Sequence, residues 1–335
     1  MVIFLIFGGV YSMKKVALLT SGGDSPGMNA CIRAVVRTGN YHGIEIIGVR
    51  QGYNGLINGW FSKLGNQDVS NIIQRGGTIL QTARCDEFKT SDGRKRAFNN
   101  LKNQAIEALI VIGGDGSYTG AKIFEQEFGV KCIGIPGTID NDLYGTDNTI
   151  GYDTALNTVV EAVDKLRDTA SSHHRLFIVE VMGRDAGFIA LRSGIGVGAE
   201  AILVPETPTY IDHLINKLET DFRQDKSSAI VIVAEGDEFG GANQVAQAVK
   251  ERFDKFDIRV SILGHIQRGG SPSAYDRVLA SQLGFEAVNA LMNGRSGVAV
   301  GLVDKKIVYT SFENAIKHHQ ELNQNLLKMA EILSL

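Results

Sequence analysis

Two loop motifs in the first half of the chain combine glycine-rich backbone with carboxylates. GGDGS (113–117) follows the apolar run 108–112, and PGTIDND (136–142) follows the apolar run 131–135. Glycines leave backbone amides free to face an anion, and the second motif sets two carboxylates one residue apart. Phosphoryl transfer with Mg²⁺ depends mainly on positioning and charge neutralisation. A phosphate cradle beside carboxylates therefore predicts a kinase.

Individual side chains in these motifs have predicted roles. Asp140 is placed to accept the proton of an attacking hydroxyl, and Thr138 to hydrogen-bond the transferred group. Asp142 would hold or orient a metal-bound water, and Asp115 beside a phosphate makes sense mainly through a bridging Mg²⁺. Ser117 would cap the helix after GGDGS. The alternatives are an Asp-capped turn and an Asx-rich surface loop, but an acidic loop directly beyond a buried strand favours function.

Basic side chains supply the counterpart to an anionic substrate. Arginine binds phosphate in a bidentate manner, so several arginines near turns predict a phosphorylated ligand. His265 and Glu235 each follow an apolar run, and we expect them to hydrogen-bond sugar hydroxyls or a phosphate. A further glycine-rich turn, SGGDSPG (21–27), would let a phosphate approach Gly22 and Gly23, although such turns are common in α/β folds. The arginines are Arg84, Arg175, Arg184, Arg259 and Arg268.

The overall composition is that of a globular protein with a full core. The chain has 335 residues, of which 44% are hydrophobic and 21% charged, so it has room for two domains. A formal charge of −3 gives no support to nucleic-acid binding. The three cysteines are widely spaced and form no CxxC, which predicts a reducing, cytoplasmic location. No apolar run approaches the roughly 20 residues that span a bilayer, so we expect no membrane association.

Apolar runs alternate with helix-like segments along the chain. The runs are continuous, which is typical of a sheet covered on both faces. This alternation predicts parallel, doubly wound α/β sheets with right-handed crossovers. Ligands bind beyond the carboxyl ends of such strands, where the glycine-rich and charged motifs fall. Strands are expected at 16–19, 44–49, 108–112, 131–135, 176–181, 202–204, 230–234 and 259–263, and helices at 28–38, 99–106, 118–127, 153–168, 211–222, 242–253 and 275–292.

The first twelve residues, MVIFLIFGGVYS, are apolar but lack a basic region and a convincing cleavage site. Met13, Lys14 and Lys15 then precede a well-formed strand. We therefore expect Met13 to be the biological start and residues 1–12 to be an upstream extension. The alternative is a short sorting or docking tail.

Seven motifs, taken in order, resemble the bacterial 6-phosphofructokinase family over almost the whole chain from Met13. The resemblance implies transfer of the γ-phosphate of ATP to the 1-hydroxyl of fructose 6-phosphate, a step of glycolysis. It also implies two doubly wound, mostly parallel sheet domains with the active site in the cleft between them. Residues 13–151 plus about 268–317 would bind ATP, and about 152–267 plus 318–335 would bind fructose 6-phosphate. The motifs are SGGDSPGMNA, GGDGS, PGTIDND, TIGYDTA, VEVMGRDAG, VPE and LGHIQRGGSP.

The resemblance further implies a role for each matching residue. Asp140 would be the base, Thr138 and Arg184 would assist it, and Asp115 and Asp142 would bind Mg²⁺. ATP would contact Gly23, Arg84, Cys85, Gly114, Asp115, Gly116 and Ser117. Fructose 6-phosphate would contact Thr138, Asp140, Met182, Gly183, Arg184, Glu235, His265 and Arg268. Arg175 and Arg259 would reach the site of a neighbouring subunit, which implies a homotetramer with shared active sites.

Departures from the family's pattern bear on the choice of phosphate donor and on allosteric control. Relatives that use pyrophosphate tend to carry Asp at Gly116 and Lys at Gly137, so glycine at both positions favours ATP. Cys85 replaces the more usual aromatic residue beside Arg84, which bears on the contacts to the adenine. Two positions that are basic in the family's effector site, which would take ADP or phosphoenolpyruvate, are Asn66 and Gln224 here. Each charge-assisted contact contributes roughly 1.5–3 kcal/mol, so we expect weakened allosteric control. The effector residues that do match are Arg33, Arg37, Arg167, Glu200 and Lys226.

Three other functions remain as alternatives. A pyrophosphate-dependent phosphofructokinase would share the fold and the base. A lipid or NAD kinase has a similar GGDG-type loop, but it would not need the sugar-phosphate arginines or HIQRGGSP. A non-catalytic sugar-phosphate sensor would not need Asp115, Asp140 and Arg184 together.

Overall fold

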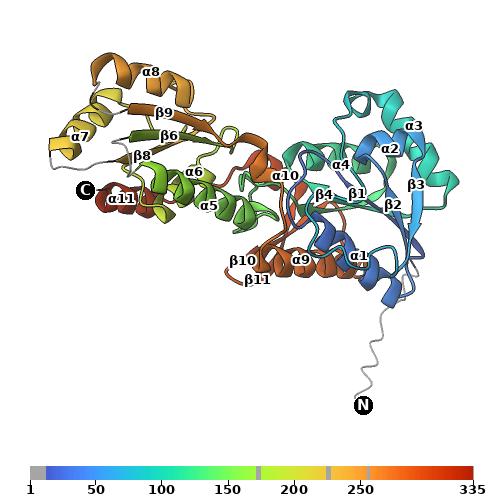
Figure 1. The fold of residues 1–335 in the computed structure, drawn as a ribbon. Coiled ribbons are helices and arrows are strands. Elements are labelled where there is room, and N and C mark those ends of the chain that lie inside the picture. Colours follow the sequence, from blue (N-terminus) through green and yellow to red (C-terminus); the bar gives the residue numbers. More distant parts are fainter. Residues whose placement is uncertain (1–12, 171–174, 224–227, 254, 256, 335) are drawn as a thin grey trace.

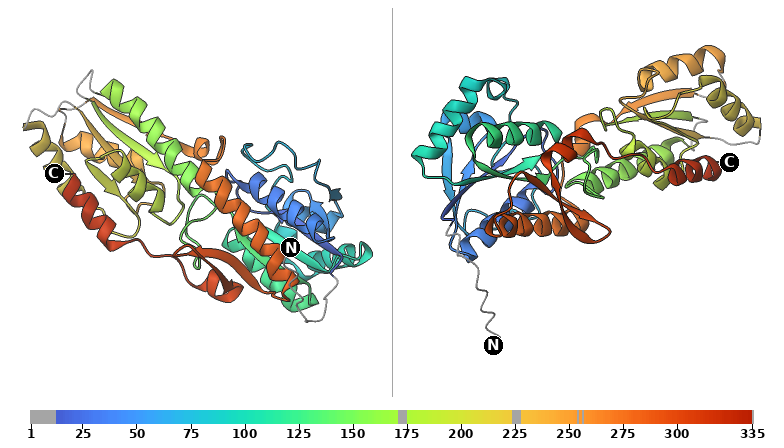
Figure 2. Two further views of the ribbon diagram at one scale, coloured as in Figure 1. Left: turned by 90° about the horizontal axis from the view of Figure 1, so that it is seen from below. Right: turned by 180° about the vertical axis from the view of Figure 1, so that it is seen from behind.

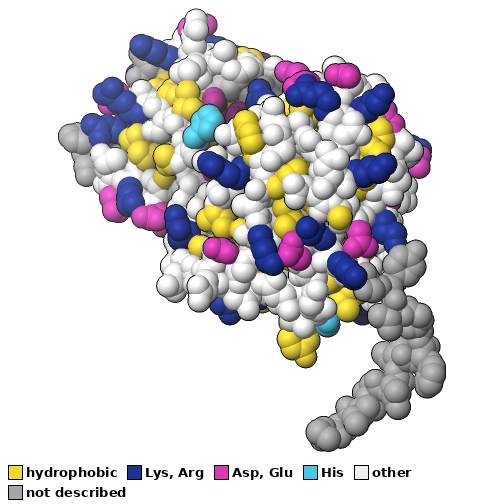
Figure 3. All heavy atoms as spheres, turned by 90° about the vertical axis from the view of Figure 1, so that its right-hand side faces the viewer, with side chains coloured by type: hydrophobic (Ala, Val, Ile, Leu, Met, Phe, Trp, Pro, Cys, Tyr) yellow, Lys and Arg dark blue, Asp and Glu magenta, His cyan; other side chains and the backbone are white. Residues whose placement is uncertain are grey.

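Continuous apolar strands build two separate sheets, each at the centre of one lobe (Figure 1). The computed structural model describes residues 13–170, 175–223, 228–253, 255 and 257–334. The two lobes lie end to end, and Figure 2 shows the same division from two further sides. On the face shown in Figure 3, basic and acidic side chains are interspersed.

The first sheet has the strand order β11-β10-β5-β4-β1-β2-β3. Its inner strands run parallel, while the edge strands β3 and β11 pair antiparallel with their neighbours. Successive side chains of a strand point to opposite faces, and both faces here are covered by helices. The strands are β1 (Lys15–Thr20), β2 (Glu45–Val49), β3 (Phe61–Leu64), β4 (Ala108–Gly113), β5 (Lys131–Pro136), β10 (Val298–Val303) and β11 (Lys306–Ser311).

The two faces of this sheet carry separate hydrophobic cores. Val16 and Leu18 of β1 belong to the core under α1 and α9, whereas Ala17 and Leu19 belong to the core under the helices of the other face. The covering helices are α1 (Met28–Tyr41) and α9 (Ala274–Met292) on one face, and α2 (Gly52–Asn58), α3 (Ser91–Asn103), α4 (Asp115–Phe128) and α10 (Phe312–Lys317) on the other. A short 3₁₀ helix, η1 (Asp86–Lys89), precedes α3.

The second sheet is parallel throughout, with the order β7-β8-β6-β9. Its strands are β6 (Arg175–Val181), β7 (Ala201–Leu203), β8 (Ala229–Ala234) and β9 (Asp257–Ile262). One face is covered by α5 (Tyr152–Ala170), α6 (Phe188–Gly196) and α11 (Gln324–Leu333), and the other by α7 (Ile211–Arg223) and α8 (Ala242–Arg252).

The chain passes between the lobes at several points. It leaves the first lobe before α5, returns through the 3₁₀ helix η2 (Gly264–Arg268) after β9, and leaves again after α10 (Figures 1 and 2). We propose that the domains have the boundaries expected from the sequence, with 13–151 and about 268–317 in one domain. The expected upstream extension, residues 1–12, lies outside the described residues.

Some local features differ from the sequence-based expectations. The helix expected at 99–106 begins at Ser91, because Thr90 caps it by accepting a hydrogen bond from the Gly93 amide at 3.1 Å. β9 is an edge strand with several exposed or half-buried side chains, so the second sheet is not covered uniformly. Several further elements were not predicted from the sequence, because their segments are short or polar. They are α2, β3, α6, β10, β11, α10 and α11. None of the described helices is long and apolar enough to cross a membrane.

Candidate active site

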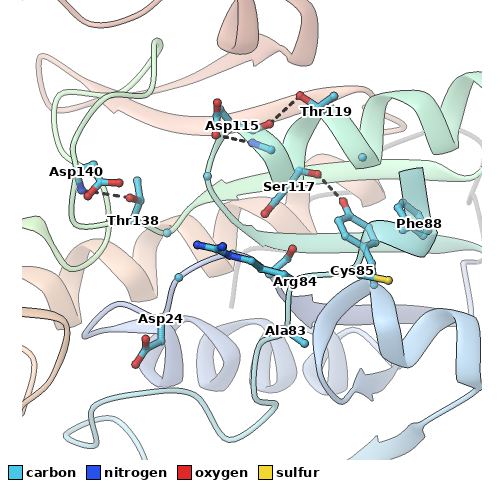
Figure 4. A pocket seen from close by; sticks show the side chains of 18 of the residues that line it. Asp24, Ala83, Arg84, Cys85, Phe88, Asp115, Ser117, Thr119, Thr138 and Asp140 are labelled. Atoms are coloured by element: carbon cyan, nitrogen blue, oxygen red, sulfur yellow. Dashed lines mark hydrogen bonds between the residues drawn. The ribbon is translucent and has the colours of Figure 1, made fainter. Parts of the chain in front are cut away.

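A cleft of about 820 Å³ lies beyond the carboxyl ends of β1, β4 and β5 and includes residues that follow β6 and β8. This is the position at which α/β sheets place their ligands. The predicted site residues that line it are Gly23, Arg84, Cys85, Gly114, Asp115, Gly116, Ser117, Thr138, Asp140, Met182, Arg184, Glu235, His265 and Arg268. Figure 4 shows part of this set, with the Arg84 side chain pointing toward the side where Thr138 and Asp140 lie.

The loop after β4 presents its backbone to the cleft. A Cβ added at Gly114 or Gly116 would meet no atom within 4 Å, so both glycines border open space. α4 begins at Asp115, and the first turn of a helix attracts anions through its free amides and its dipole. The Asp115 carboxylate accepts a hydrogen bond from the Gly116 amide at 2.6 Å (Figure 4). The loop can therefore cradle a phosphate beside a carboxylate.

Ser117 does not cap α4, contrary to the sequence-based prediction. The helix begins at Asp115 with Gly114 at its N-cap, and no side chain makes a capping hydrogen bond there. Ser117 instead lies inside the first turn, and its carbonyl accepts a hydrogen bond from the buried hydroxyl of Tyr53. Tyr53 thereby ties α2 to the base of the cradle.

Asp140 is a buried carboxylate at the wall of the cleft. It is 3% exposed, and its Oδ1 has no hydrogen-bond partner among the described residues. Its backbone amide donates to Thr138 Oγ1 at 3.2 Å, and Arg268 Nη2 lies 3.9 Å from Oδ1. Burial raises the pKa of Asp140, while Arg268, the Thr138 hydrogen bond and Arg184 act against that rise. A desolvated carboxylate with a free oxygen is a suitable general base.

The backbone between the two carboxylates is held by Asn141. This residue has φ +54°, in the left-handed region that Asn tolerates better than most side chains. Its Oδ1 accepts a hydrogen bond from the Thr149 amide at 2.8 Å, and the Thr149 hydroxyl donates to the Thr138 carbonyl at 2.6 Å. Both ends of the loop are thus joined, which fixes the direction in which Asp140 projects.

Asp142 lies beside the cleft but does not line it. Burial, followed by the negative charges of Asp140 and Asp115, raises the pKa of Asp142 to about 6. Asp142 is therefore close enough to Asp140 and Asp115 to be repelled by both. Such repulsion favours a bound cation.

A strained turn after β6 carries Arg184 into the cleft, whereas the predicted substrate residue Gly183 belongs to this turn but does not line the cleft. Gly183 has φ +146° and Arg184 has φ +54°, so two successive amides point the same way. Glu235, at the end of β8, accepts hydrogen bonds from both amides, at 3.2 Å from Gly183 and 2.8 Å from Arg184. In this structure Glu235 fixes the turn that carries Arg184, by accepting these two hydrogen bonds. The sequence did not predict this role for Glu235.

An apolar corner of the cleft was missed by sequence reasoning. The rings of Tyr53 and Phe88 stack with centroids 4.0 Å apart, and both line the cleft, as does Cys85. Arg94 holds this wall by donating to the carbonyls of Phe88 and Lys89, at 3.1 and 2.7 Å. The sequence signals were weak because α2, which carries Tyr53, was not predicted, and because Arg94 acts on backbone atoms. Gly22 and Gly137, which the sequence had linked to phosphate approach and donor choice, also line the cleft. The cleft's other unpredicted residues are Ser21, Asp24, Ala83, Asp86, Thr119, Gly120 and Ile123.

Two predicted substrate arginines do not line this chain's cleft. The side chains of Arg175 and Arg259 both pair with Asp257, at 3.4 and 2.8 Å. Arg175 opens β6 and Arg259 lies inside β9, whereas the cleft lies beyond the carboxyl end of β6. Their contribution to a neighbouring subunit's site stays a prediction.

The predicted effector residues are divided between the two lobes. Arg33 and Arg37 lie on α1, and burial together with the nearby charge of Arg37 lowers the pKa of Arg33. Arg167 lies on α5 and donates to the Val197 carbonyl, while Glu200 accepts from the Ile230 amide at 2.5 Å. Gln224 and Lys226 lie outside the described residues. The role of these residues in binding an effector stays a prediction.

The carboxylates near the cleft suit a Mg²⁺ ion that the protein and the substrate phosphates bind together. The part of the chain that the structure describes has no group of three or more His, Cys, Asp or Glu side chains that could hold a metal ion. Mg²⁺ is commonly bound by one or two carboxylates together with substrate phosphates. Asp140 Oδ1 has no hydrogen-bond partner among the described residues, and nearby negative charge raises the pKa of Asp142, so this region could accept a cation. Asp115 and Asp142 are thus compatible with such a site.

Sequence and structure comparisons identify related proteins. Residues 15–291 match the family described as Phosphofructokinase. The ATP-dependent 6-phosphofructokinase 2 of Bacteroides thetaiotaomicron is 55% identical over 97% of this chain and 99% of its own length. The solved phosphofructokinase of Saccharomyces cerevisiae has a TM-score of 0.87 and 38% identity, covering 96% of this chain and 47% of the yeast chain. A pyrophosphate-dependent phosphofructokinase from Marinobacter aquaeolei has a TM-score of 0.83 at 22% identity, covering 96% and 91%, which shows the fold alone.

Replacing Asp142 by Asn tests the electrostatics of this loop in the ligand-free protein with chelator present. The folded state disfavours the charged form of Asp142, which lowers the free energy of unfolding wherever that form would be populated. This loss of stability is nearly absent below the unfolded-state pKa of about 4 and is complete above a pH of about 6. We expect D142N to raise the free energy of unfolding by roughly 1–3 kcal/mol at pH 8, and by clearly less at pH 4.5. Urea denaturation at both pH values measures this. A larger gain at pH 4.5, or a loss at pH 8, would contradict it.

Proposed function

This chain belongs to the phosphofructokinase family, and we propose that it transfers the γ-phosphate of ATP to the 1-hydroxyl of fructose 6-phosphate. The products are ADP and fructose 1,6-bisphosphate, and the reaction belongs to glycolysis. The observation that carries the mechanism is the buried Asp140. It lines the same cleft as the glycine loop after β4 and the side chains of Arg84, Arg184 and Arg268, and its Oδ1 accepts no hydrogen bond from the described residues.

The nucleotide would occupy the side of the cleft formed by the first lobe. Gly114 and Gly116 let phosphates approach the start of α4, and Gly23 borders the same space. The apolar corner of Tyr53, Phe88 and Cys85 offers a flat, dry surface for a base. Arg84 points from this side toward Thr138, where it would neutralise charge on the transferred phosphate (Figure 4).

The sugar phosphate would bind on the opposite side, between the two lobes. Met182, Arg184 and Glu235 come from the second sheet, and His265 and Arg268 from η2. Arg268 already lies near the base, so it is placed to hold an anionic substrate with a hydroxyl toward Asp140. Gly183 would support this side through the turn that Glu235 holds.

Transfer follows from these positions. The 1-hydroxyl attacks the γ-phosphate in line, and Asp140 Oδ1 takes its proton as the new O–P bond forms and the bond to ADP breaks. Thr138 would hydrogen-bond the transferred group, while Arg84 and Arg184 neutralise its charge. When bound at Asp115 and Asp142, Mg²⁺ would supply further charge neutralisation at the phosphates.

The choice of ATP over pyrophosphate is supported by space at the donor end. Gly116 has no atom within 4 Å of an added Cβ, so a larger residue would project into the volume proposed for the nucleotide. At Gly137 an added Cβ would lie 2.8 Å from Ile112 Cγ2, so this position is closely packed. Relatives named ATP-dependent 6-phosphofructokinase match nearly the whole chain.

Assembly and control are further proposals. We propose a homotetramer in which Arg175 and Arg259 complete the substrate site of a neighbouring subunit. Their location outside this chain's cleft is compatible with that role. ADP or phosphoenolpyruvate would act at the predicted effector residues. A cytoplasmic location stays a prediction from the cysteines.

Asp140→Ser removes the base while keeping a small polar side chain. We expect kcat to fall by about 10²–10⁴-fold, because a positioned base contributes that much, and the dissociation constants of both substrates to change little. Steady-state rates and calorimetric binding measure the two effects. Near-normal turnover would remove Asp140 as the base. Asp24→Ser, at another carboxylate that lines the cleft, serves as a control for altered charge.

Gly116→Asp tests the donor site. A carboxylate in this open space would repel the phosphates of ATP, so we expect KM for ATP to rise about tenfold or more, equivalent to about 1.4 kcal/mol per factor of ten. Gly116→Ala adds bulk without charge and should have a smaller effect. Unchanged KM for ATP in the Asp variant would show that this residue does not border the nucleotide.

The response of the enzyme to effectors tests Asn66 and Gln224, the two positions where the family carries basic residues. With two charges missing, we expect ADP and phosphoenolpyruvate to shift fructose 6-phosphate saturation only weakly. Asn66 is exposed, and Asn66→Arg restores one charge, so this variant should respond more strongly to ADP. Saturation curves with and without each effector provide the measurement. A full, strongly cooperative response of the unmodified enzyme would contradict the expectation.

A further inference from the structure

Asp276 is a buried carboxylate outside the cleft. It lies in the first turn of α9 and is 0% exposed. Its Oδ1 accepts a hydrogen bond from the Gly151 amide at 2.9 Å, and its Oδ2 accepts from the Thr154 amide at 2.8 Å and the Thr154 hydroxyl at 2.5 Å. Burying a charged group is costly unless it is well hydrogen-bonded, so three donors at one carboxylate mark a built interaction.

The donors belong to the start of α5, where helix amides have no partner inside the helix. Asp276 therefore caps α5 from another helix, and its charge also suits the positive end of that helix dipole. The relation is reciprocal at α9. The amide of Ser273, the N-cap of α9, donates to Thr154 Oγ1 at 2.9 Å, and its hydroxyl donates to Asp153 at 2.5 Å. We call this set of bonds the helix-start clamp.

Backbone close to the clamp is packed without room for side chains. An added Cβ at Gly151 would lie 2.5 Å from Ser25 Cβ, and one at Gly27 would lie 2.6 Å from Ile150 Cγ2. Both glycines have positive φ, +105° and +112°. Three loops, from SGGDSPG, from the end of the Asp140 loop and from the start of α9, thus meet at one point that leaves little freedom for rearrangement.

Each side of the clamp is connected through the chain to a group in the cleft. On one side, Gly151 lies two residues after Thr149, which hydrogen-bonds to Thr138 and Asn141 and so positions the base Asp140. On the other side, Ser273 follows η2, which carries His265 and Arg268. Arg268 Nη2 lies 3.9 Å from Asp140 Oδ1, so the relative position of the two segments sets this distance.

We propose that Asp276 is a positioning residue for phosphoryl transfer, which holds the segment carrying His265 and Arg268 in register with Asp140. It touches no reacting atom in this role. The inference rests on the proposed function, because it assigns Arg268 to the sugar phosphate and Asp140 to its hydroxyl. None of the clamp bonds described above involves the loop after β4 or η1, which form most of the nucleotide side of the cleft. The SGGDSPG loop, which carries Gly23, packs against Gly151 through Ser25 but makes none of these bonds.

Asp276→Asn tests the proposal. The amide keeps the shape but places an NH₂ group against the donors of α5. We expect KM for fructose 6-phosphate to rise at least fivefold and kcat/KM for it to fall at least tenfold, with KM for ATP within twofold of wild type. A purely structural role would lower the amount of active enzyme, reducing kcat while leaving both KM values unchanged.

A second pair of variants keeps the test decisive should D276N not fold. Thr154→Val removes only the hydroxyl that joins Asp276 to Ser273, while Thr154→Ser keeps it. We expect the Val variant to raise KM for fructose 6-phosphate at least threefold and the Ser variant to stay within twofold of wild type. Ser281→Ala is the matched control on α9, because among the described residues the Ser281 hydroxyl bonds only to the Arg277 carbonyl of the same helix.

The outcomes separate the inference from the proposed function. A selective rise in KM for fructose 6-phosphate, rescued by Ser at 154, supports the clamp. Kinetics within twofold of wild type in both D276N and Thr154→Val, or equal changes for both substrates, would overturn it. If the wild type forms no product, the proposed function fails instead. Calorimetry then decides the inference, which requires D276N or Thr154→Val to weaken fructose 6-phosphate binding at least threefold.

Discussion

Asp140 lies where water is largely excluded, yet it must exchange a proton with a substrate hydroxyl. Burial alone raises its pKa and would favour the neutral acid, which cannot act as a base. Arg268 and Arg184 oppose that effect from two different segments, and a hydrogen bond from the Thr138 side chain acts in the same direction. The rest of the site is arranged to hold these groups around one carboxylate.

Neither lobe could supply this arrangement alone. The adjacent parallel strands β4 and β5 end together, so the cradle at Gly114 and the base at Asp140 arise from one sheet edge. Arg184 and Glu235 come from the other sheet, and their turn has left-handed backbone that Glu235 stabilises. Backbone strain of this kind persists only where its surroundings fix it. The helix-start clamp then joins the two lobes through α5 and α9.

Much of this was predictable from the sequence, because continuous apolar strands locate their own carboxyl ends and hence the loops that carry Asp115 and Asp140. The rest depended on contacts between distant residues. Tyr53 entered the cleft from a short helix with no clear periodic pattern, and Arg94 acts by holding the carbonyls of Phe88 and Lys89. The prediction for Ser117 was wrong because α4 begins at Asp115, a boundary that local preference does not fix. Asp276 was not singled out from the sequence, because its partners lie over a hundred residues away.

The most direct test of the account is product formation from fructose 6-phosphate and Mg²⁺ with ATP or pyrophosphate as the sole phosphate donor. Detection of fructose 1,6-bisphosphate by ³¹P NMR identifies the product without coupling enzymes. The account predicts product with ATP and none with pyrophosphate. Product with pyrophosphate alone would contradict the assignment of the donor site, and no product with either would contradict the enzyme itself and favour a sugar-phosphate sensor.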